Sequence, residues 1–376
     1  MAPNHLSKPW HEHITIDLLA HVLNRSLFHP FIAWLIPLCQ RAVGAPYDSF
    51  NFTATCIYAS IVTLIWVLGF LNTRIAYGLP RELDWDEEVV VITGGASGLG
   101  KILTETYGMR GASVAVLDVR DPEEEESEGL ATVKFYKCDV GDAEAVVRTR
   151  EQIEKDLGTP TILINNAGIV HGKPLLGPNS LTPSEIAQTL RINTLAHFHT
   201  LQAFLPGMLG SPQGGTIVTI SSVLGKLGAS HLADYTASKA ALIALHASLR
   251  AELTSPAAPE GAERIRTVLV TPGQLSTTLF AGVQTPSSFL GPVVEVVELA
   301  GEIVRMVDAG ESGEISMPLY ARYIEWLHVL PAGLQRVVRK VSGMDRAMEG
   351  FRGGRGPGTD NKRPSPRQQQ KKALET

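Results

Sequence analysis

Apolar runs alternate with helical periodicity along the middle of the chain. From Glu88 onward, short runs rich in β-branched residues are separated by longer segments in which apolar positions recur every three or four residues. Seven runs are predicted to be strands: Val89–Thr93, Ser113–Asp118, Val133–Asp139, Thr161–Asn165, Thr216–Ser221, Arg266–Thr271 and Glu314–Met317. Several are almost continuously apolar, as strands covered by helices on both faces must be. The alternation predicts an α/β fold with a doubly wound parallel sheet of about seven strands.

A different apolar pattern precedes the first strand. No residue between Asp48 and Arg74 is charged, and Phe52–Leu71 supplies the 20 residues that cross about 30 Å of hydrocarbon at about 1.5 Å each. This segment predicts a transmembrane helix. The alternative is a buried helix of a soluble domain, but the residues up to Leu83 have no partner elements that could bury it. The apolar run begins too far into the chain for a cleaved signal peptide.

Two other segments have membrane-related patterns. Ser26–Gln40 is apolar but short and contains two prolines, so it is expected to lie in the membrane interface or to re-enter rather than span. Residues 320–349 begin with an amphipathic pattern in which Tyr323, Trp326, Leu327 and Leu330 can share a side. Two interpretations of this pattern remain open, namely a membrane-interfacial segment and a terminal helix packed on the domain.

These patterns divide the chain into four parts. They are an N-terminal anchor region (1–83), an α/β domain (84–319), the amphipathic segment (320–349) and a basic tail (350–376). The tail is rich in Gly, Pro, Gln, Lys and Arg, cannot bury enough apolar area to offset its ordering entropy, and is expected to be disordered. The acidic run Asp121–Glu128 is most simply a solvated loop.

Composition narrows the function classes. Apolar residues make up 44% and charged residues 19% of the chain, which suits a globular core with membrane attachment. The net charge of −5 provides no positive field for nucleic acid, so no nucleic-acid partner is expected. Three cysteines are too few and too scattered for a disulfide framework or a cysteine-based zinc site, and no metal is expected. Their scarcity also indicates a reducing compartment, with the α/β domain facing the cytosol.

A glycine-rich turn follows the first predicted strand and precedes a helical segment. In this position glycines let the backbone approach a pyrophosphate, and the helix N-terminus offers free amides to it. Asp118 ends the next strand 18 residues after Gly100, where an acid can bind ribose hydroxyls. The combination predicts a Rossmann-type dinucleotide site that includes Thr93, Gly94, Ser97, Gly98, Leu99, Gly100 and Asp118.

A second group of residues fits acid/base chemistry. Tyr235 and Lys239 are four residues apart on a predicted helix and therefore share a face. An ammonium beside a phenol favours the phenolate, so Lys239 is expected to lower the tyrosine pKa toward the working pH. Ser222 lies 13 residues before Tyr235, just past a strand, where open α/β sheets place ligands.

Together these motifs resemble the short-chain dehydrogenase/reductase family over about 235 residues, in its membrane-anchored hydroxysteroid/retinol dehydrogenase branch. The resemblance implies a catalytic tetrad of Asn193, Ser222, Tyr235 and Lys239. It makes Tyr235 the acid/base, with Ser222 on the substrate oxygen, Lys239 on the nicotinamide ribose and Asn193 holding a water. It also implies cofactor contacts by Asp139, Asn166, Ala167, Gly168, Pro272, Gly273, Leu275 and Thr277, besides Tyr235 and Lys239.

The branch acts on lipid-soluble alcohols, so the expected substrate is a steroid, retinoid or long-chain alcohol, and the expected location is the endoplasmic reticulum or lipid droplets. Asp118 favours NAD over NADP because its charge opposes a 2′-phosphate, although Arg120 lies two residues away. Two alternatives are an NADPH-dependent ketoacyl or sphingoid-base reductase and a non-catalytic membrane or lipid-droplet binding module. A homodimer is left open.

Overall fold

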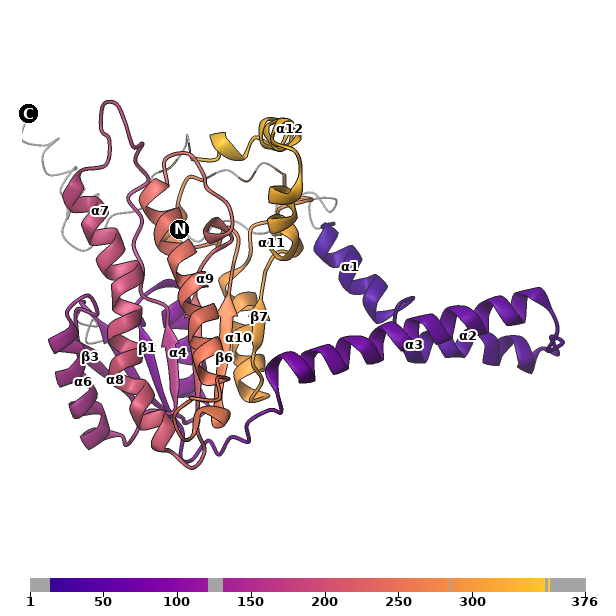
Figure 1. Ribbon diagram of the computed structural model, residues 1–376, viewed down its shortest axis with the longest axis horizontal. Helices are drawn as coiled ribbons and strands as arrows, with labels where there is room; N and C mark the ends of the chain where they lie inside the picture. The colour runs from indigo at the N-terminus through magenta and orange to yellow at the C-terminus, as the bar shows by residue number, and fades with distance from the viewer. Residues whose placement is uncertain (1–13, 121–130, 284, 286, 349–350, 352–376) are drawn as a thin grey trace, which may run out of the picture.

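A seven-stranded parallel sheet forms the centre of the molecule (Figure 1). The computed structural model describes residues 14–120, 131–283, 285, 287–348 and 351. The strands are β1 (Val89–Thr93), β2 (Ser113–Asp118), β3 (Val133–Lys137), β4 (Ile162–Asn165), β5 (Gly215–Ile220), β6 (Ile265–Val270) and β7 (Gly313–Ile315). The predicted fold class is confirmed. Each predicted strand overlaps an observed one, and the largest boundary difference is two residues, at the ends of β3 and β7.

Helices cover both faces of the sheet. The helices of the α/β region are α4 (Gly98–Met109), α6 (Ala143–Asp156), α7 (Pro183–Leu190), α8 (Ala196–Gly210), α9 (Ala233–Leu253) and α10 (Val296–Asp308). One core joins Val90 and Ile92 of β1 to α4 and α10, and the other joins Val89 and Val91 to α6, α8 and α9. Successive side chains of a strand point to opposite faces, so the apolar run of β1 feeds both cores.

The strand order is β3-β2-β1-β4-β5-β6-β7, and it reverses direction at β1. From β1 the chain proceeds outward to β2 and β3, and then returns to the other side of β1 with β4. Ligands of open α/β sheets bind at such a reversal, outside the carboxyl ends of the strands. The loops after β1 and β4, which carry the glycine-rich turn and Asn166–Gly168, therefore meet at one place.

Within the described residues, three helices precede the sheet, α1 (Ile16–Arg25), α2 (Pro30–Ala42) and α3 (Phe50–Tyr77). Figure 1 shows α2 and α3 lying side by side as a pair that extends away from the sheet. Small residues allow the approach, since Ala33 and Ala59 are fully buried between the helices, and Trp34 Nε1 donates to Thr63 Oγ1 at 3.0 Å. Helix α2 continues through Pro37.

Helix α3 is, among the described residues, the one helix long and apolar enough to cross a membrane by itself. Only 11% of its most apolar 18-residue window is buried, which argues against the alternative of a core helix of a soluble domain. Helices α1 and α2 pass the same test only as a pair bent by 53°. Such a bent pair is either a broken span or a re-entrant loop, so the expectation that Ser26–Gln40 lies in the interface or re-enters stays a prediction.

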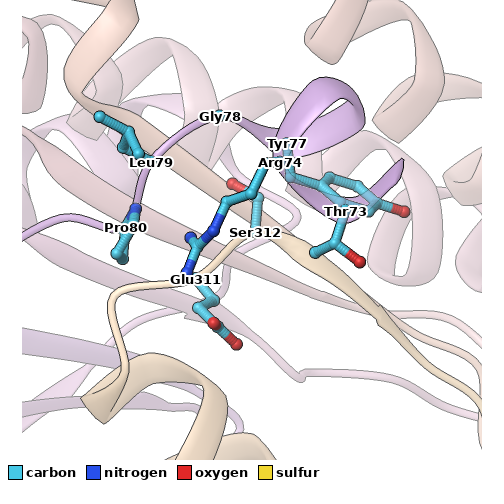
Figure 2. Close-up of a pocket in the computed structure, with 8 residues that line it drawn as sticks. All are labelled: Thr73, Arg74, Tyr77, Gly78, Leu79, Pro80, Glu311 and Ser312. Atoms are coloured by element: carbon cyan, nitrogen blue, oxygen red, sulfur yellow. The ribbon is translucent and has the colours of Figure 1, made fainter. Parts of the chain in front are cut away.

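The linker after α3 is fixed to the amino ends of the strands. Arg81 forms a buried ion pair with Glu88 at 2.8 Å, and its backbone amide donates to the Gly310 carbonyl at 2.8 Å. A small pocket lies where the end of α3 and the linker pass the turn before β7; it is lined by Thr73, Arg74, Tyr77, Gly78, Leu79, Pro80, Glu311 and Ser312 (Figure 2). It belongs to the junction between α3 and the sheet, because the ligand edge of a parallel sheet is the opposite, carboxyl edge.

The amphipathic segment is broken rather than continuous. Helix α11 (Leu319–Tyr323) passes into a 3-10 turn (Ile324–Val329), and α12 (Ala332–Ser342) starts after Pro331. The expectation that Tyr323, Trp326, Leu327 and Leu330 share a side is wrong, because Leu327 is buried while Tyr323 and Trp326 are exposed. No residue of α12 is buried. The predicted tail lies outside the described residues, except for Phe351.

Candidate active site

The glycine-rich turn after β1 has a conformation and close contacts that leave no room for larger residues at its glycine positions. Gly94 and Gly98 have φ values of +65° and +56°, which favour glycine. A Cβ on Gly100 would lie 2.3 Å from the Gly94 carbonyl oxygen, and a Cβ on Gly94 would lie 2.9 Å from Ala167 Cα. Helix α4 begins at Gly98, after Ser97 at its N-cap, and Leu99 is buried against the sheet. The turn therefore leaves backbone amides accessible at the N-terminus of α4, as the binding of a pyrophosphate requires.

Asp118 ends β2 with its carboxylate beside this turn. One carboxylate oxygen accepts from the Ala96 amide and the other from the Arg120 amide, both at 3.1 Å. Each oxygen keeps a further lone pair for another donor. The two amides orient the carboxylate next to the glycine turn, where it can accept from ribose hydroxyls.

The loop after β4 is pinned to β1 by Thr93 and Asn166. The Thr93 hydroxyl accepts from the backbone amides of Asn166 (2.9 Å) and Ala167 (3.0 Å). The Asn166 side chain donates to the carbonyls of Thr93 (3.0 Å) and Gly94 (3.1 Å). These bonds hold the two loops of the reversal together. Thr93 and Asn166 thus support the shape of the site through the backbone.

Asp139 lies at the same edge, just past β3. Its carboxylate accepts from the Gly141 amide at 2.9 Å and pairs with Arg191 at 2.8 Å. Both partners of this ion pair are about 40% exposed, so the pair contributes little to stability. The ion pair joins the loop that follows β3 to Arg191, which precedes α8.

Asn193 is fully buried in a π-helical segment, Arg191–Leu195, between α7 and α8. Its amide oxygen accepts from the Ile169 amide at 2.8 Å, and its amide nitrogen donates to the Ile169 carbonyl (2.9 Å) and to Ser238 Oγ (3.1 Å). The side chain therefore joins the loop after β4 to helix α9. Single π turns inside helices are frequent at functional sites.

Tyr235, Lys239 and Ser222 converge beside this loop, and all three are buried. Lys239 Nζ donates to the Ile220 carbonyl at 2.9 Å and lies 5.7 Å from the centre of the Tyr235 ring. The Ser222 hydroxyl donates to the Pro272 carbonyl at 3.4 Å and accepts from the Leu224 amide at 3.1 Å. It is close enough to the Tyr235 phenol to lower the pKa of that phenol. A Cβ on Gly168 would lie 3.5 Å from Asn193 Oδ1 and 3.7 Å from Lys239 Nζ. The structure thus brings all four residues of the predicted tetrad together.

The electrostatics of the pair differ from the sequence-based expectation. Burial raises the pKa of the Tyr235 phenol above its usual value, with Ser222 acting in the opposite direction. Burial also lowers the pKa of Lys239 to about 8. The expected lowering of the tyrosine pKa by Lys239 is therefore not seen, because desolvation disfavours both charged forms and the ammonium is bonded to a carbonyl instead.

The loop after β6 closes the other side of the site. The Pro272 carbonyl accepts from the Val223 amide at 2.9 Å, next to Ser222, and the Gly273 amide donates to Met317. Leu275 pairs with Val294 in an isolated bridge. Thr277 Cγ2 would lie 3.7 Å from a Cβ on Gly98, so this loop faces the glycine turn. The predicted residues of this loop are thereby placed between the tetrad and the turn.

Three features of the site were missed by sequence reasoning. Phe280 packs edge-on against Tyr235, with ring centroids 5.6 Å apart. Arg191 pairs with Asp139, and its position inside a π turn has no signal in the apolar pattern. Met348 and Phe351 lie in the same apolar cluster as Tyr235, although they are more than 100 residues away along the chain.

The arrangement fits a dinucleotide. The glycine turn is a cradle that a Cβ would fill, the helix N-terminus points toward it, and the Asp118 carboxylate lies beside it. The residues that would hold the group lie along one edge of the sheet: Thr93, Gly94, Ser97, Gly98, Leu99, Gly100, Asp118, Asp139, Asn166, Ala167, Gly168, Pro272, Gly273, Leu275 and Thr277. The Tyr235 phenol lies near Ser222, just past β5, so a cofactor bound along this edge would lie near it.

The sequence and the fold are similar to those of known oxidoreductases. Residues 88–287 match the family model described as short chain dehydrogenase. The chain is 34% identical to the uncharacterized oxidoreductase TDA5 of Saccharomyces cerevisiae over 300 residues, covering 79% of this chain and 89% of the relative. It is 34% identical to human epidermal retinol dehydrogenase 2 over 272 residues, covering 70% and 85%. A crystal structure of a short chain dehydrogenase from Burkholderia cenocepacia in complex with NADP superposes with a TM-score of 0.54 at 24% identity, covering 69% of this chain and 99% of that one.

Proposed function

The chain belongs to the short-chain dehydrogenase/reductase family, as an alcohol-type oxidoreductase that uses a nicotinamide cofactor, and from this premise we propose that its substrate is a lipid-soluble alcohol or the corresponding carbonyl compound. The candidates are a steroid, a retinoid and a long-chain alcohol. The observation that carries the proposal is the burial of Tyr235 in an apolar cluster next to Ser222 and Lys239. A water-soluble alcohol would gain little from such surroundings.

The chain's own residues supply binding and proton transfer. Ser222 holds the substrate oxygen, and Tyr235 gives a proton to this oxygen or takes one from it. Lys239 compensates the phenolate that forms, because a buried ammonium and a buried phenolate stabilise one another. Asn193 fixes the loop against which the pair packs. The nicotinamide ring, when bound, supplies or accepts the hydride.

The surroundings of the site support an apolar substrate. The loop after β6 is mostly apolar or uncharged between Ser276 and Val294, of which residues 284 and 286 lie outside the described residues. This loop contacts the anchor region, because the Ile16 amide donates to the Phe289 carbonyl at 3.1 Å. Asp17 also accepts from the Leu319 amide at 2.6 Å. The anchor therefore adjoins the substrate side of the site, where a bilayer-dissolved alcohol would arrive.

A comparison of alcohols tests the proposal. Purified protein in detergent is offered a long-chain primary alcohol, retinol, a steroid alcohol and ethanol, each with oxidised cofactor, and the absorbance of reduced cofactor is followed. We expect turnover of at least one lipid alcohol with kcat/KM at least about 100-fold above that for ethanol, because each buried CH₂ contributes about 0.8 kcal/mol. Equal or better turnover of ethanol would overturn the substrate assignment.

We propose NAD as the cofactor, because the oriented Asp118 carboxylate lies where a 2′-phosphate of NADP would be repelled. Each oxygen of Asp118 already accepts one backbone amide and retains a lone pair for a ribose hydroxyl. Arg120 is the residue that could reverse this preference by pairing with the phosphate.

The location that fits this function is the membrane of the endoplasmic reticulum or of lipid droplets, with the α/β domain on the cytosolic side. Helix α3 supports membrane attachment, and Cys138 is the one cysteine of the α/β domain, so the domain needs no oxidising compartment. When sealed microsomes that contain the protein are treated with protease, we expect the α/β domain to be degraded. Full protection of the domain until detergent is added would show the opposite orientation.

A further inference from the structure

The C-terminal part of the chain returns to the catalytic tyrosine. Met348 is 7% exposed and belongs to one apolar cluster with Val170, Leu232 and Tyr235. Phe351 packs against the same cluster, and its amide donates to the Met348 carbonyl at 3.1 Å. Two residues from beyond the sheet domain thus take part in the surroundings of the reacting group.

The Phe351 ring packs against Gly172, which lies in the loop after β4. A Cβ on Gly172 would lie 2.2 Å from Phe351 Cε1 and 2.3 Å from its Cδ1. Contacts this short do not occur between non-bonded carbons, so the ring lies directly on the glycine backbone. Gly172 also has a φ of +64°, which disfavours any other residue there.

The remaining neighbours in this cluster are also apolar. They are Leu224, Ala229, Leu279, Phe280 and Val283. A substrate whose oxygen reaches Ser222 and Tyr235 would have these side chains beside its carbon skeleton, because they pack in one cluster with the Tyr235 ring. These residues would therefore meet the part of the substrate that differs between one lipid alcohol and another.

We propose that Met348 and Phe351 are specificity-determining residues, which form the outer wall of the substrate site and limit the width of the alcohol that it accepts. The proposal rests on the proposed function, since it assigns a role within the same site. It predicts that removing either side chain opens space that a wide skeleton can use, while a slim chain loses contacts.

Substrate preference in Phe351→Ala and Met348→Ala tests this role. The full chain in detergent is assayed with a long-chain primary alcohol, retinol and a steroid alcohol. We expect kcat/KM for the wider alcohols to rise relative to the slimmer ones by about tenfold or more, the effect of a small change of shape in an apolar pocket. Val341→Ala serves as a control, because Val341 is 82% exposed on α12 and should leave the ratios unchanged.

Gly172→Ala provides an independent test, with Gly177→Ala as its matched control. Both glycines lie in the same loop with positive φ, at +64° and +101°, but nothing lies within 4 Å of a Cβ on Gly177. Both variants carry the backbone strain, whereas only Gly172→Ala displaces the Phe351 ring. We expect Gly172→Ala, but not Gly177→Ala, to change the substrate ratios in the direction of Phe351→Ala.

The outcomes separate the two proposals. Suppose that the wild type turns over a lipid alcohol, and that the Met348, Phe351 and Gly172 variants keep the wild-type ratios of kcat/KM between alcohols within about threefold. The specificity role of Met348 and Phe351 is then wrong, and the proposed function stands. An equal loss for all alcohols in these variants would assign Met348 and Phe351 a structural role and would also overturn the wall. If the wild type turns over none of the three alcohols, the proposed function fails and the wall fails with it.

Discussion

Tyr235→Phe is expected to lower kcat by about 100- to 10,000-fold, the usual contribution of a positioned acid/base group. The substitution removes one oxygen atom and keeps the ring that packs edge-on against Phe280. The phenol is the ionisable group beside Ser222, so proton transfer to the substrate oxygen has no replacement at that position. The affinity for cofactor and the melting temperature should change little, because the ring keeps its apolar contacts.

The control is Tyr136→Phe, which removes a phenol that donates to Asp156 at 3.1 Å on the surface of the sheet domain. Its kcat should equal that of the wild type. The measurement is steady-state turnover of a lipid alcohol together with cofactor affinity from titration. A Tyr235→Phe variant that retains more than about a tenth of wild-type kcat would show that another group transfers the proton.

Asp118→Ala is expected to shift cofactor preference from NAD toward NADP by about five- to a thousandfold. Two like charges about 4 Å apart cost about 1 to 4 kcal/mol across effective dielectric constants of 80 to 20, which corresponds to this range. Asp118 also supplies the acceptors for the ribose hydroxyls, so NAD affinity falls in the same variant. The measurement is kcat/KM for both cofactors with one alcohol.

Two further variants distinguish the effect of the Asp118 charge on cofactor preference from the effects of its side-chain shape and of Arg120. Asp118→Asn keeps the size of the side chain and an acceptor for a backbone amide, so it should relieve the repulsion of NADP with less loss of NAD. Arg120→Ala should leave the NAD preference intact. A wild-type preference for NADP that disappears in Arg120→Ala would mean that Arg120, rather than Asp118, sets the choice.

Sequence patterns predicted most of the sheet because strands buried on both faces are marked by their own composition. The runs Val89–Thr93 and Ser113–Asp118 coincide with β1 and β2, since apolar β-branched residues end there at a glycine turn and at an acid. The residues that the sequence groups into one site lie at one edge of the sheet for a similar reason. In a parallel sheet every strand delivers its following loop to one edge, so residues just past strands must lie near one another.

The features that escaped prediction depend on contacts between distant segments. Met348 and Phe351 reach Tyr235 only because the chain beyond α12 returns over the loop that contains Gly172, and no local periodicity encodes this return. The segment around Trp326 has an amphipathic pattern, but Pro331 and the burial of Leu327 divide it into separate turns. The pKa of Lys239 could not be anticipated either, because its cause is the depth of burial.

The most direct test of the account is the fate of the hydrogen at the carbinol carbon. Full-length protein in detergent is incubated with oxidised cofactor and a retinoid, steroid or long-chain alcohol that carries deuterium at that carbon, and the cofactor is analysed by mass spectrometry. The account predicts that the deuterium is recovered in the reduced cofactor, in an amount equal to the carbonyl product, and that Tyr235→Phe nearly abolishes both. Carbonyl product whose deuterium is lost to water, or the absence of product from all three classes of alcohol, would contradict it.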